Sequence, residues 1–378
     1  MGITTVTRDG CKRLLYASQR GRWLRYLKNL TSMALTARTF AYDVLTAVEH
    51  GGFADDLLRA KAMEPQEANL ASELVFGVLR QRGQLDYLIG HYAGKVSKLD
   101  REVRIALRMG IYQLRYLDRI PAHAAVSTSV DLVKRARKAS AVGFVNAVLR
   151  KVNREPVSYP DDAVALSMPD WLLAKWEGQF GRKAAHTAAA YFLSKPPAHQ
   201  RGERQMDIGA QQIVPLLELR AEHRFLDVCA APGNKTLQAA ECGVRPVACD
   251  RSRKRLAGIG VEMRVQLDAA VALPFRAVFD RILVDAPCSG TGTLGRNPEI
   301  KWRVSAEEFS RQAERQVSIL GAALAVLAPG GRLVYSTCSL EREENEAVIE
   351  RFGERVRSQG YRMPGQDAGD GFFHAVLA

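Results

Sequence analysis

Apolar residues in the first part of the chain recur three and four positions apart, the spacing that places side chains on one face of an α-helix. Phe40, Val44 and Val48 follow this spacing, and so do Val103 and Leu107. Few of the alternations typical of β-strands interrupt the pattern, so we predict an all-helical bundle. The predicted helices cover residues 37–48, 67–82, 85–92 and 101–117, and a further helical pair begins at Pro121.

The pattern changes further along the chain to short apolar runs separated by helical segments. Such an alternation predicts an open parallel sheet, in which binding sites form at the carboxyl ends of the strands. Most of the runs end in a residue that can bind or react. The runs are RFLDVCAA, VRPVACD, FDRILVDAP and GRLVYSTCS.

These patterns divide the chain into four segments. Residues 1–32 form a basic N-terminal extension, and residues 33–153 form the helical domain. Residues 154–212 are a linker that includes the turn-rich stretch SKPPAHQRGERQ, and residues 213–378 form the sheet domain. The extension is an RNA-binding arm, a disordered tail, or residues upstream of a true start at Met33, and its composition favours the last two interpretations.

The composition is that of an ordinary globular protein, with 47% hydrophobic and 25% charged residues. No apolar run approaches the ~20 residues of a membrane-spanning helix, and no secretory signal begins the chain. No cysteines form a CxxC pair, so we expect free thiols in a reducing cytoplasm, and we predict no metal site. The six cysteines are Cys11, Cys229, Cys242, Cys249, Cys288 and Cys338.

The positive charge is concentrated in the front of the chain. Of a net charge of +13, residues 1–153 carry +12, with 25 Lys and Arg against 13 Asp and Glu. A basic module attracts a phosphate backbone, although a solvated surface explains the same excess. The best candidate for a phosphate-contacting patch, with a solvated helix end as the alternative, is the cluster Lys134, Arg135, Arg137 and Lys138.

The first strand of the predicted sheet ends in a sharp turn, DVCAAPGNKT. Gly233 in this turn lets the backbone approach a ligand beside a helix N-terminus. The second strand ends at Asp250, where a carboxylate could accept hydrogen bonds from a ribose diol. Asp268 ends a predicted third strand and could meet an adenine edge. A helix N-cap or a turn carboxylate explains each aspartate alone equally well.

Two cysteines follow neighbouring strands of the predicted sheet. Cys288 lies in DAPCSGTGTLGRNPEIKW and Cys338 in YSTCS. A lone cysteine at a strand end is more often a small buried apolar residue. Two of them at the active-site edge of one sheet, each next to a serine, favour chemistry. A thiolate can attack covalently, whereas a hydroxyl needs strong activation.

With these motifs, residues 225–340 resemble the RsmB/Sun (Fmu) family of RNA cytosine-C5 methyltransferases. The matching segments are CAAPGNKT, Asp250 followed by Arg255-Leu256, DAPCSGTG, NPEIKW, STCS followed by EENE, and the closing GDGFFHAVLA. Residues 37–153 resemble the NusB-like domain of the RsmB branch through ELVFGVLRQRG, IPAHAAVSTSV and GFVNAVLR. The resemblance implies an α-helical NusB-like RNA-binding domain followed by a Rossmann-like α/β class I methyltransferase domain.

The resemblance also implies an activity and a cofactor. The chain would transfer a methyl group from S-adenosylmethionine to carbon 5 of a cytosine. The substrate would be 16S ribosomal RNA, free or in an early small-subunit particle, and the protein would act as a monomer. Asp250, followed by Arg255, would hold the ribose, and Asp268 the adenine. The methionine part would be held by Cys229, Ala230, Ala231, Pro232, Gly233, Asn234 and Lys235.

In the same family pattern Cys338 is the nucleophile, Cys288 helps to release the product, and Asp285 lies between cofactor and base. The chemistry asks for such groups, because carbon 5 of cytosine is a poor nucleophile until a thiolate adds to carbon 6. Asp285 could then hydrogen-bond or protonate N3, and the base must be unstacked. The residue types alone leave open the reverse assignment, in which Cys288 attacks from its Pro-Cys dipeptide.

One departure from the family bears on the activity. Relatives usually carry a small mixed α/β RNA-contacting subdomain before the catalytic sheet, whereas only a short stretch joins Tyr191 to Met206 here. This loss motivates a second hypothesis, an RNA-binding NusB-like protein with a weakened methyltransferase domain. A third hypothesis, an NAD-linked oxidoreductase, is disfavoured because the turn AAPGNK contains Gly233 alone in place of GxGxxG.

Overall fold

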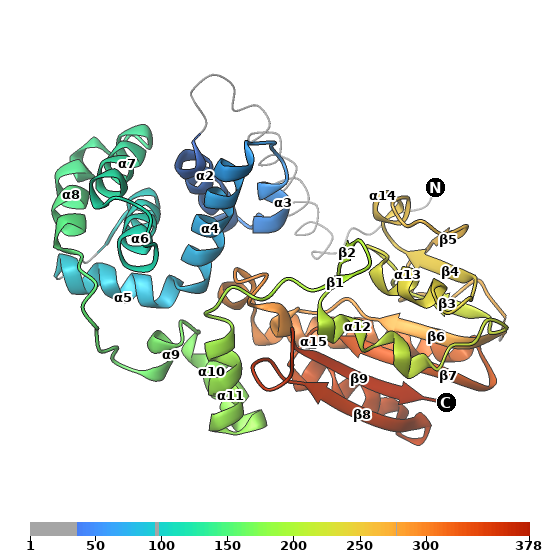
Figure 1. The fold of residues 1–378 in the computed structure, drawn as a ribbon. Helices are drawn as coiled ribbons and strands as arrows, with labels where there is room; N and C mark the ends of the chain where they lie inside the picture. Colours follow the sequence, from blue (N-terminus) through green and yellow to red (C-terminus); the bar gives the residue numbers. More distant parts are fainter. Residues whose placement is uncertain (1–35, 95–97, 277) are drawn as a thin grey trace, which may run out of the picture. The chain divides into compact units, whose positions relative to one another are not determined.

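A computed structural model describes residues 36–94, 98–276 and 278–378. The chain divides into two units, one of Met1–Asp170 with Asn297–Glu299 and the other of Trp171–Arg296 with Ile300–Ala378 (Figure 1). The basic extension at residues 1–32 lies outside the described residues. Across the described parts, every helix is too short or too polar to cross a membrane.

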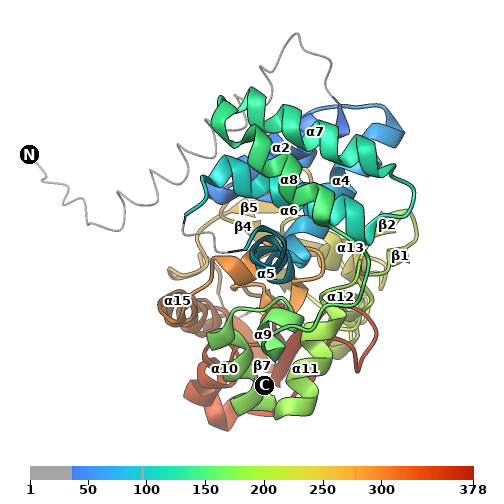
Figure 2. The same ribbon diagram turned by 90° about the vertical axis from the view of Figure 1, so that its left-hand side faces the viewer.

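The described part of the first unit is built from helices, as its apolar spacing predicts. Phe40, Leu74 and Leu107 lie in one buried core, each from a different helix. Figure 2 shows these helices packed alongside one another. The helices are α2 (Ala37–Glu49), α3 (Ala54–Leu58), α4 (Pro65–Arg80), α5 (Arg82–Ala93), α6 (Arg101–Tyr116), α7 (Ala122–Arg135), the 3-10 turn η1 (Ala139–Ala141), α8 (Val142–Lys151) and α9 (Asp162–Ala165).

Local sequence determines how these helices begin and how closely they pack. Thr36 and Thr39 form a capping box at the start of α2, in which each side chain accepts from the other's backbone N–H. Pro65 occupies the first turn of α4, where a missing N–H leaves no bond unmade. Gly77 lets α4 approach α6, because a Cβ there would lie 2.0 Å from Cζ of Tyr112.

The second unit begins with two helices and a short hairpin. The helices α10 (Asp170–Phe180) and α11 (Arg182–Tyr191) precede β1 (Gln200–Arg201) and β2 (Arg204–Gln205), which pair antiparallel. Residues 192–207 are all described, and the hairpin is the only regular secondary structure among them. The elements α12 (Ile208–Gln211) and η2 (Val214–Leu217) then lead into the sheet.

The sheet of the second unit has seven strands in the order β5-β4-β3-β6-β7-β9-β8. Strands β3 to β7 pair in parallel, as predicted, while β9 pairs antiparallel with both β7 and β8. The pattern of apolar runs did not predict β8, whose sequence VRSQGYR is largely polar. The strands are β3 (Phe225–Asp227), β4 (Pro246–Asp250), β5 (Met263–Gln266), β6 (Phe279–Asp285), β7 (Leu327–Thr337), β8 (Val356–Arg362) and β9 (Phe372–Leu377).

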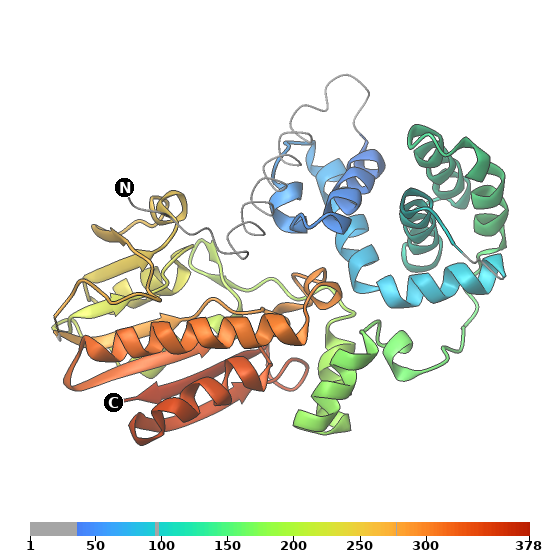
Figure 3. The ribbon, with the colours of Figure 1, turned by 180° about the vertical axis from the view of Figure 1, so that it is seen from behind.

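Both faces of the sheet are covered, so its strand ends are left to form a site. Leu226 of β3 packs in the same cluster as Ile319 of α15, which Figure 3 shows lying across one face. Its neighbour Phe225 points to the other face and packs in a cluster with Val214. The covering and connecting elements are α13 (Asn234–Ala240), α14 (Arg253–Leu256), η3 (Thr291–Thr293), η4 (Ile300–Trp302), α15 (Ala306–Ala325), η5 (Arg342–Glu344), α16 (Glu346–Ile349) and η6 (Glu350–Arg355).

Candidate active site

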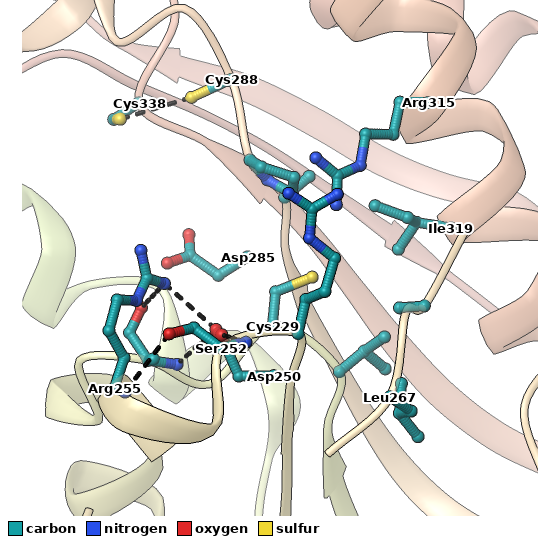
Figure 4. Close-up of a pocket in the computed structure, with 16 residues that line it drawn as sticks. Cys229, Asp250, Ser252, Arg255, Leu267, Asp285, Cys288, Arg315, Ile319 and Cys338 are labelled. Atoms are coloured by element: carbon teal, nitrogen blue, oxygen red, sulfur yellow. Dashed lines mark hydrogen bonds and ion pairs between the residues drawn. The ribbon is translucent and has the colours of Figure 1, made fainter. Parts of the chain in front are cut away.

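The carboxyl ends of β3, β4, β6 and β7 surround a cavity of about 380 Å³, within the size range of small-molecule sites. Figure 4 shows Cys288 and Cys338 at one end of the view and Asp250 at the other, with Asp285 between them. Predicted residues that line the cavity are Cys229, Ala231, Asp250, Arg255, Asp285, Cys288 and Cys338. Predicted residues outside its lining are Ala230, Pro232, Gly233, Asn234, Lys235 and Asp268.

The turn after β3 is held in one shape by its backbone. Ala230 donates its N–H to the carbonyl of Cys249 at 2.8 Å, which ties the turn to β4. Gly233 has φ of 110°, and a Cβ there would lie 2.9 Å from Cγ2 of Ile259. A side chain at this position would therefore be strained and would also clash. Cys229 and Ala231 of this turn line the cavity, whereas the missing side chain of Gly233 makes room for Ile259.

Asp250 ends β4, and its carboxylate is surrounded by nitrogen donors. One oxygen accepts from the backbone N–H of Ser252 at 2.7 Å. The other accepts from the N–H of Ala231 at 3.3 Å and from the guanidinium of Arg255 at 3.1 Å. Arg255 also donates to the Ala231 carbonyl at 2.9 Å. The two predicted residues therefore form one unit, in which Arg255 orients the carboxylate and the turn.

Asp268 lies just beyond β5 and is flanked by two arginines. Its carboxylate is 3.5 Å from Arg251 and 3.7 Å from Arg315. Burial opposes ionisation, but a backbone N–H and the two guanidinium groups lower the pKa of Asp268. Both arginines line the cavity, as do Leu267 and Ala269 on either side of Asp268. Sequence analysis gave Arg315 no role, because helical spacing does not show which polar residue faces a cavity.

Lys235 lies beside Asp285 at the end of β6. Its Nζ donates to one carboxylate oxygen at 2.6 Å, and the Ser336 hydroxyl donates to the other at 2.8 Å. Burial lowers the pKa of Lys235, but the Asp285 charge outweighs it and the net change is upward. Nζ also lies 5.2 Å from the ring centre of Phe372. Lys235 is thus a fixed cation next to Asp285.

Cys288 and Cys338 come together because β6 and β7 are paired in parallel. Their sulfur atoms lie 3.4 Å apart, and the described cysteines are all free thiols. The hydrogen bond with Cys338, together with burial, raises the pKa of Cys288 well above its ordinary value. Either sulfur can be the donor of the hydrogen bond between them. The predicted meeting of the two thiols at one sheet edge is confirmed.

Glu344 is a residue of this region to which sequence analysis assigned no role. It ends η5, is fully buried, and accepts hydrogen bonds from Ser289 and Ser339, which follow the two cysteines. Burial raises the pKa of Glu344, although the hydrogen bonds oppose this. The segment EENE belonged to the family match, but an acidic run is usually exposed and gives no sign of a buried contact.

The basic cluster of the first unit is largely engaged in ion pairs. Lys134 and Lys138 each pair with an exposed aspartate, at 3.0 and 2.9 Å. Arg135 binds the buried carboxylate of Asp43 with two nitrogens, at 2.9 and 2.8 Å. These pairs favour the alternative of a solvated helix end, stabilised by Arg135, over a patch of cations free to bind phosphate.

Comparisons with known proteins match two parts of the chain to two families. Residues 214–361 match the family described as 16S rRNA methyltransferase RsmB/F, and residues 35–154 match the NusB family. The chain is 33% identical over 399 residues to ribosomal RNA small subunit methyltransferase B of Thermus thermophilus, covering 90% of this chain and 97% of that protein. It is 30% identical over 430 residues to the protein of the same name from Erwinia tasmaniensis, covering 93% and 99%.

A solved structure supports the fold. The crystal structure of PH0851 superposes with a TM-score of 0.71 at 19% identity, covering 92% of this chain and 100% of that one. At this identity the likeness concerns the arrangement of helices and strands, and the chemistry rests on the residues of the site.

Proposed function

Because the chain belongs to the family of ribosomal RNA small subunit methyltransferase B, we propose that it methylates carbon 5 of a cytosine in 16S ribosomal RNA. The methyl donor is S-adenosylmethionine. The observation that carries the proposal is the pair of free thiols 3.4 Å apart, next to Asp285 at the sheet edge. Two sulfurs in contact suit a reaction in which one bonds to a ring carbon and the other assists its departure.

The cavity fits S-adenosylmethionine in size and in the chemistry of its walls. Cys229 and Ala231 of the turn after β3 line it, and the segment Cys229–Lys235 would hold the methionine part. Asp250 would accept the ribose hydroxyls, with Arg255 keeping it oriented. The segment around Asp268 would meet the adenine, since both neighbours of that residue line the cavity. Bound there, the cofactor supplies an electrophilic methyl group.

Cys338 is the proposed nucleophile. The sulfur of Cys288 lies 3.4 Å from that of Cys338, so a protonated Cys288 could donate to a thiolate there, and this contact together with burial raises the pKa of Cys288. The thiolate forms a bond to carbon 6 of the cytosine, and the ring electrons move to carbon 5. Carbon 5 thereby becomes nucleophilic enough to accept a methyl group. The resemblance to the family, in which the nucleophile lies in the STCS segment, favours this assignment over the reverse one.

Asp285 and Lys235 would steady the ring as its charge changes. Once protonated, Asp285 would donate a hydrogen bond or its proton to N3, so negative charge does not accumulate on the ring when sulfur adds to carbon 6. Lys235 and Ser336 hold the Asp285 carboxylate from two sides and fix its direction. A group fixed in advance needs no reorganisation when the charge develops.

Release follows from the electrostatic connection between the two thiols. Once Cys338 is bonded to carbon 6, its sulfur is a neutral thioether, and the main influence that raises the pKa of Cys288 is gone. Cys288 can then lose its proton to solvent and take the proton from carbon 5. The ring double bond forms again, the bond between sulfur and carbon 6 breaks, and Cys338 recovers its electron pair.

The test is methylation of 16S ribosomal RNA, free and in small-subunit particles, with labelled cofactor and bisulfite sequencing. We expect one cytosine to become resistant to bisulfite only when protein and cofactor are both present. Label without a resistant cytosine would place the methyl group on another atom. RNA binding without label would favour an RNA-binding protein with a weakened methyltransferase domain, which the short stretch between Tyr191 and Met206 motivates.

A further inference from the structure

The two cysteine loops of the second unit repeat one another. Ser289 follows Cys288 after β6, and Ser339 follows Cys338 after β7. The hydroxyl oxygens of the two serines lie 3.1 Å apart, next to the sulfur atoms at 3.4 Å. The same two loops are therefore in contact twice, once through the reacting atoms and once through the residue that follows them.

One carboxylate joins both loops. Oε2 of Glu344 accepts from the hydroxyls of Ser289 and Ser339, at 2.5 Å each. Oε1 accepts from the backbone N–H of Ser289 at 2.8 Å and from Nε2 of Gln316 at 3.3 Å. The residue is 0% exposed, so its charge is stabilised by these donors instead of by water.

The turn that carries Glu344 is itself anchored to β7. Tyr335 donates its hydroxyl to the carbonyl of Glu344 at 2.6 Å. The next residue, Asn345, accepts from the Thr337 hydroxyl at 2.5 Å and donates to the carbonyl of Ser339 at 2.9 Å. The carboxylate is therefore a fixed point to which the loops are tied.

We propose that Glu344 is a positioning residue for the two-cysteine reaction, and that its buried carboxylate keeps Cys288 and Cys338 in contact while the base adds and leaves. This inference rests on the proposed function, which gives the thiol pair its task. Glu344 contacts Ser289 and Ser339 and makes no hydrogen bond to the reacting sulfur atoms. If the two loops moved apart, an adduct on Cys338 would lie out of reach of Cys288, the thiol proposed to release it.

The charge of Glu344 also acts on the pair. Together with Cys338 and burial, it raises the pKa of Cys288. The other titratable groups of the cluster are Tyr335 on β7 and Glu341 before η5, while α15 contributes a neutral glutamine. Removing the charge of Glu344 should therefore lower the pKa of Cys288.

The first measurement compares Glu344→Gln with Glu343→Gln in the full chain. Glutamine keeps the size of the side chain and can still accept from the N–H of Ser289, but it carries no charge. Glu343 binds Lys175 at 2.8 and 2.9 Å, so it is a matched control on the same turn. For Glu344→Gln we expect kcat to fall about tenfold or more with KM for RNA unchanged, and for Glu343→Gln no change in either.

The second measurement does not depend on methylation. Alkylation of Cys288 by iodoacetamide, followed by mass spectrometry across a range of pH, reports when this thiol ionises. We expect the profile to move to lower pH in Glu344→Gln and to stay in place in Glu343→Gln. Should Glu344→Gln fail to fold, Ser339→Ala unties one loop and should still lower kcat. An unchanged kcat in that variant would overturn the proposal.

The outcomes separate this inference from the proposed function. If Glu344→Gln matches Glu343→Gln in both kcat and alkylation profile, the positioning role is wrong. If the profile moves but the wild-type protein does not methylate carbon 5, the proposed function is wrong and the control of Glu344 over the thiols stands.

Discussion

Asp285 and Ser336 are register partners on β6 and β7, and the Ser336 hydroxyl donates to the Asp285 carboxylate at 2.8 Å. Two strands that run in the same direction end at the same edge of a sheet, so the residues that follow them also meet there. Cys288 and Cys338 meet in this way. The parts of the site come from separate strand ends, and substitutions can therefore test them one at a time.

Substitution of each cysteine should have a different result. Cys338→Ser should abolish methylation and keep RNA binding, because a serine hydroxyl is far less ionised than a thiol near neutral pH. Cys288→Ser should permit attack and methyl transfer but stall release. A covalent protein–RNA adduct should then persist in denaturing gels, and it should require both the cofactor and Cys338.

Cys242→Ser is the control for this pair, since Cys242 is an exposed thiol outside the cavity lining. It should methylate as the wild type does and trap no adduct. Adducts trapped only by Cys338→Ser would assign the attack to Cys288, the alternative that the residue types leave open. Adducts from neither variant would leave the covalent route without support.

Loss of the Asp250 carboxylate should weaken cofactor binding. Hydrogen bonds to a charged acceptor contribute about 1.5–3 kcal/mol, so Asp250→Ala should bind S-adenosylmethionine about tenfold to a hundredfold more weakly in a calorimetric titration. Asp280→Ala is the control, because this carboxylate lies near the start of β6 and pairs with Arg224 at 2.9 Å. Equal affinities in the two variants would remove Asp250 from the cofactor site.

Stability should depend on pH through Asp227 of β3. Burial raises the pKa of this carboxyl group from 3.8 to about 7, with the Thr236 hydroxyl opposing the change. Between about pH 3.8 and about pH 7, folded Asp227 keeps a proton that the same residue releases in the unfolded chain. The free energy of unfolding therefore falls as pH rises through this range. In Asp227→Asn the free energy of unfolding should fall less, and the variant should be more stable than the wild type only above about pH 7.

Urea unfolding at about pH 4 and about pH 8 measures this difference. The pKa of Glu341 is also raised to about 7, by burial, but this residue is present in both proteins. The difference between the two proteins therefore isolates Asp227. Parallel pH dependences of the wild type and Asp227→Asn would contradict the prediction.

Neighbouring cations of the basic cluster should differ in their effect on stability. Arg135→Ala leaves the buried carboxylate of Asp43 without its partner and should lower the free energy of unfolding by about 1–3 kcal/mol. Lys134→Ala breaks an exposed pair and should change it by less than about 0.5 kcal/mol. Chemical denaturation measures both free energies of unfolding. Equal decreases in the two variants would argue against a structural role for Arg135.

The helices and strand ends of this protein can be predicted from its sequence, because they depend on patterns of residues close together in the chain. The spacing of Phe40, Val44 and Val48 is enough to predict a helix, since one buried face is all that it requires. Asp250, Asp285 and Cys338 can be predicted at one sheet edge because each lies at or just beyond the end of an apolar run, and parallel strands share that edge.

The parts that sequence did not predict depend on contacts between distant segments. Glu344 lies in an acidic run, and only the folded chain shows that two serine hydroxyls meet its carboxylate. Arg135 and Lys134 are adjacent cations in sequence, yet one faces a buried aspartate and the other faces solvent. Strand β8 pairs at the edge of the sheet, where a polar sequence carries little of the apolar signal.

The register of β6 and β7 also controls when the protein becomes reactive during its own synthesis. A slip of one residue would turn the side chains of β7 to the opposite face, and a chain in which the strands are still apart has two ordinary thiols. Such a chain lacks the contact between the two thiols that the proposed release step needs. A nascent or misfolded copy therefore lacks the assembled site that the proposed reaction requires, so activity depends on correct folding of the sheet.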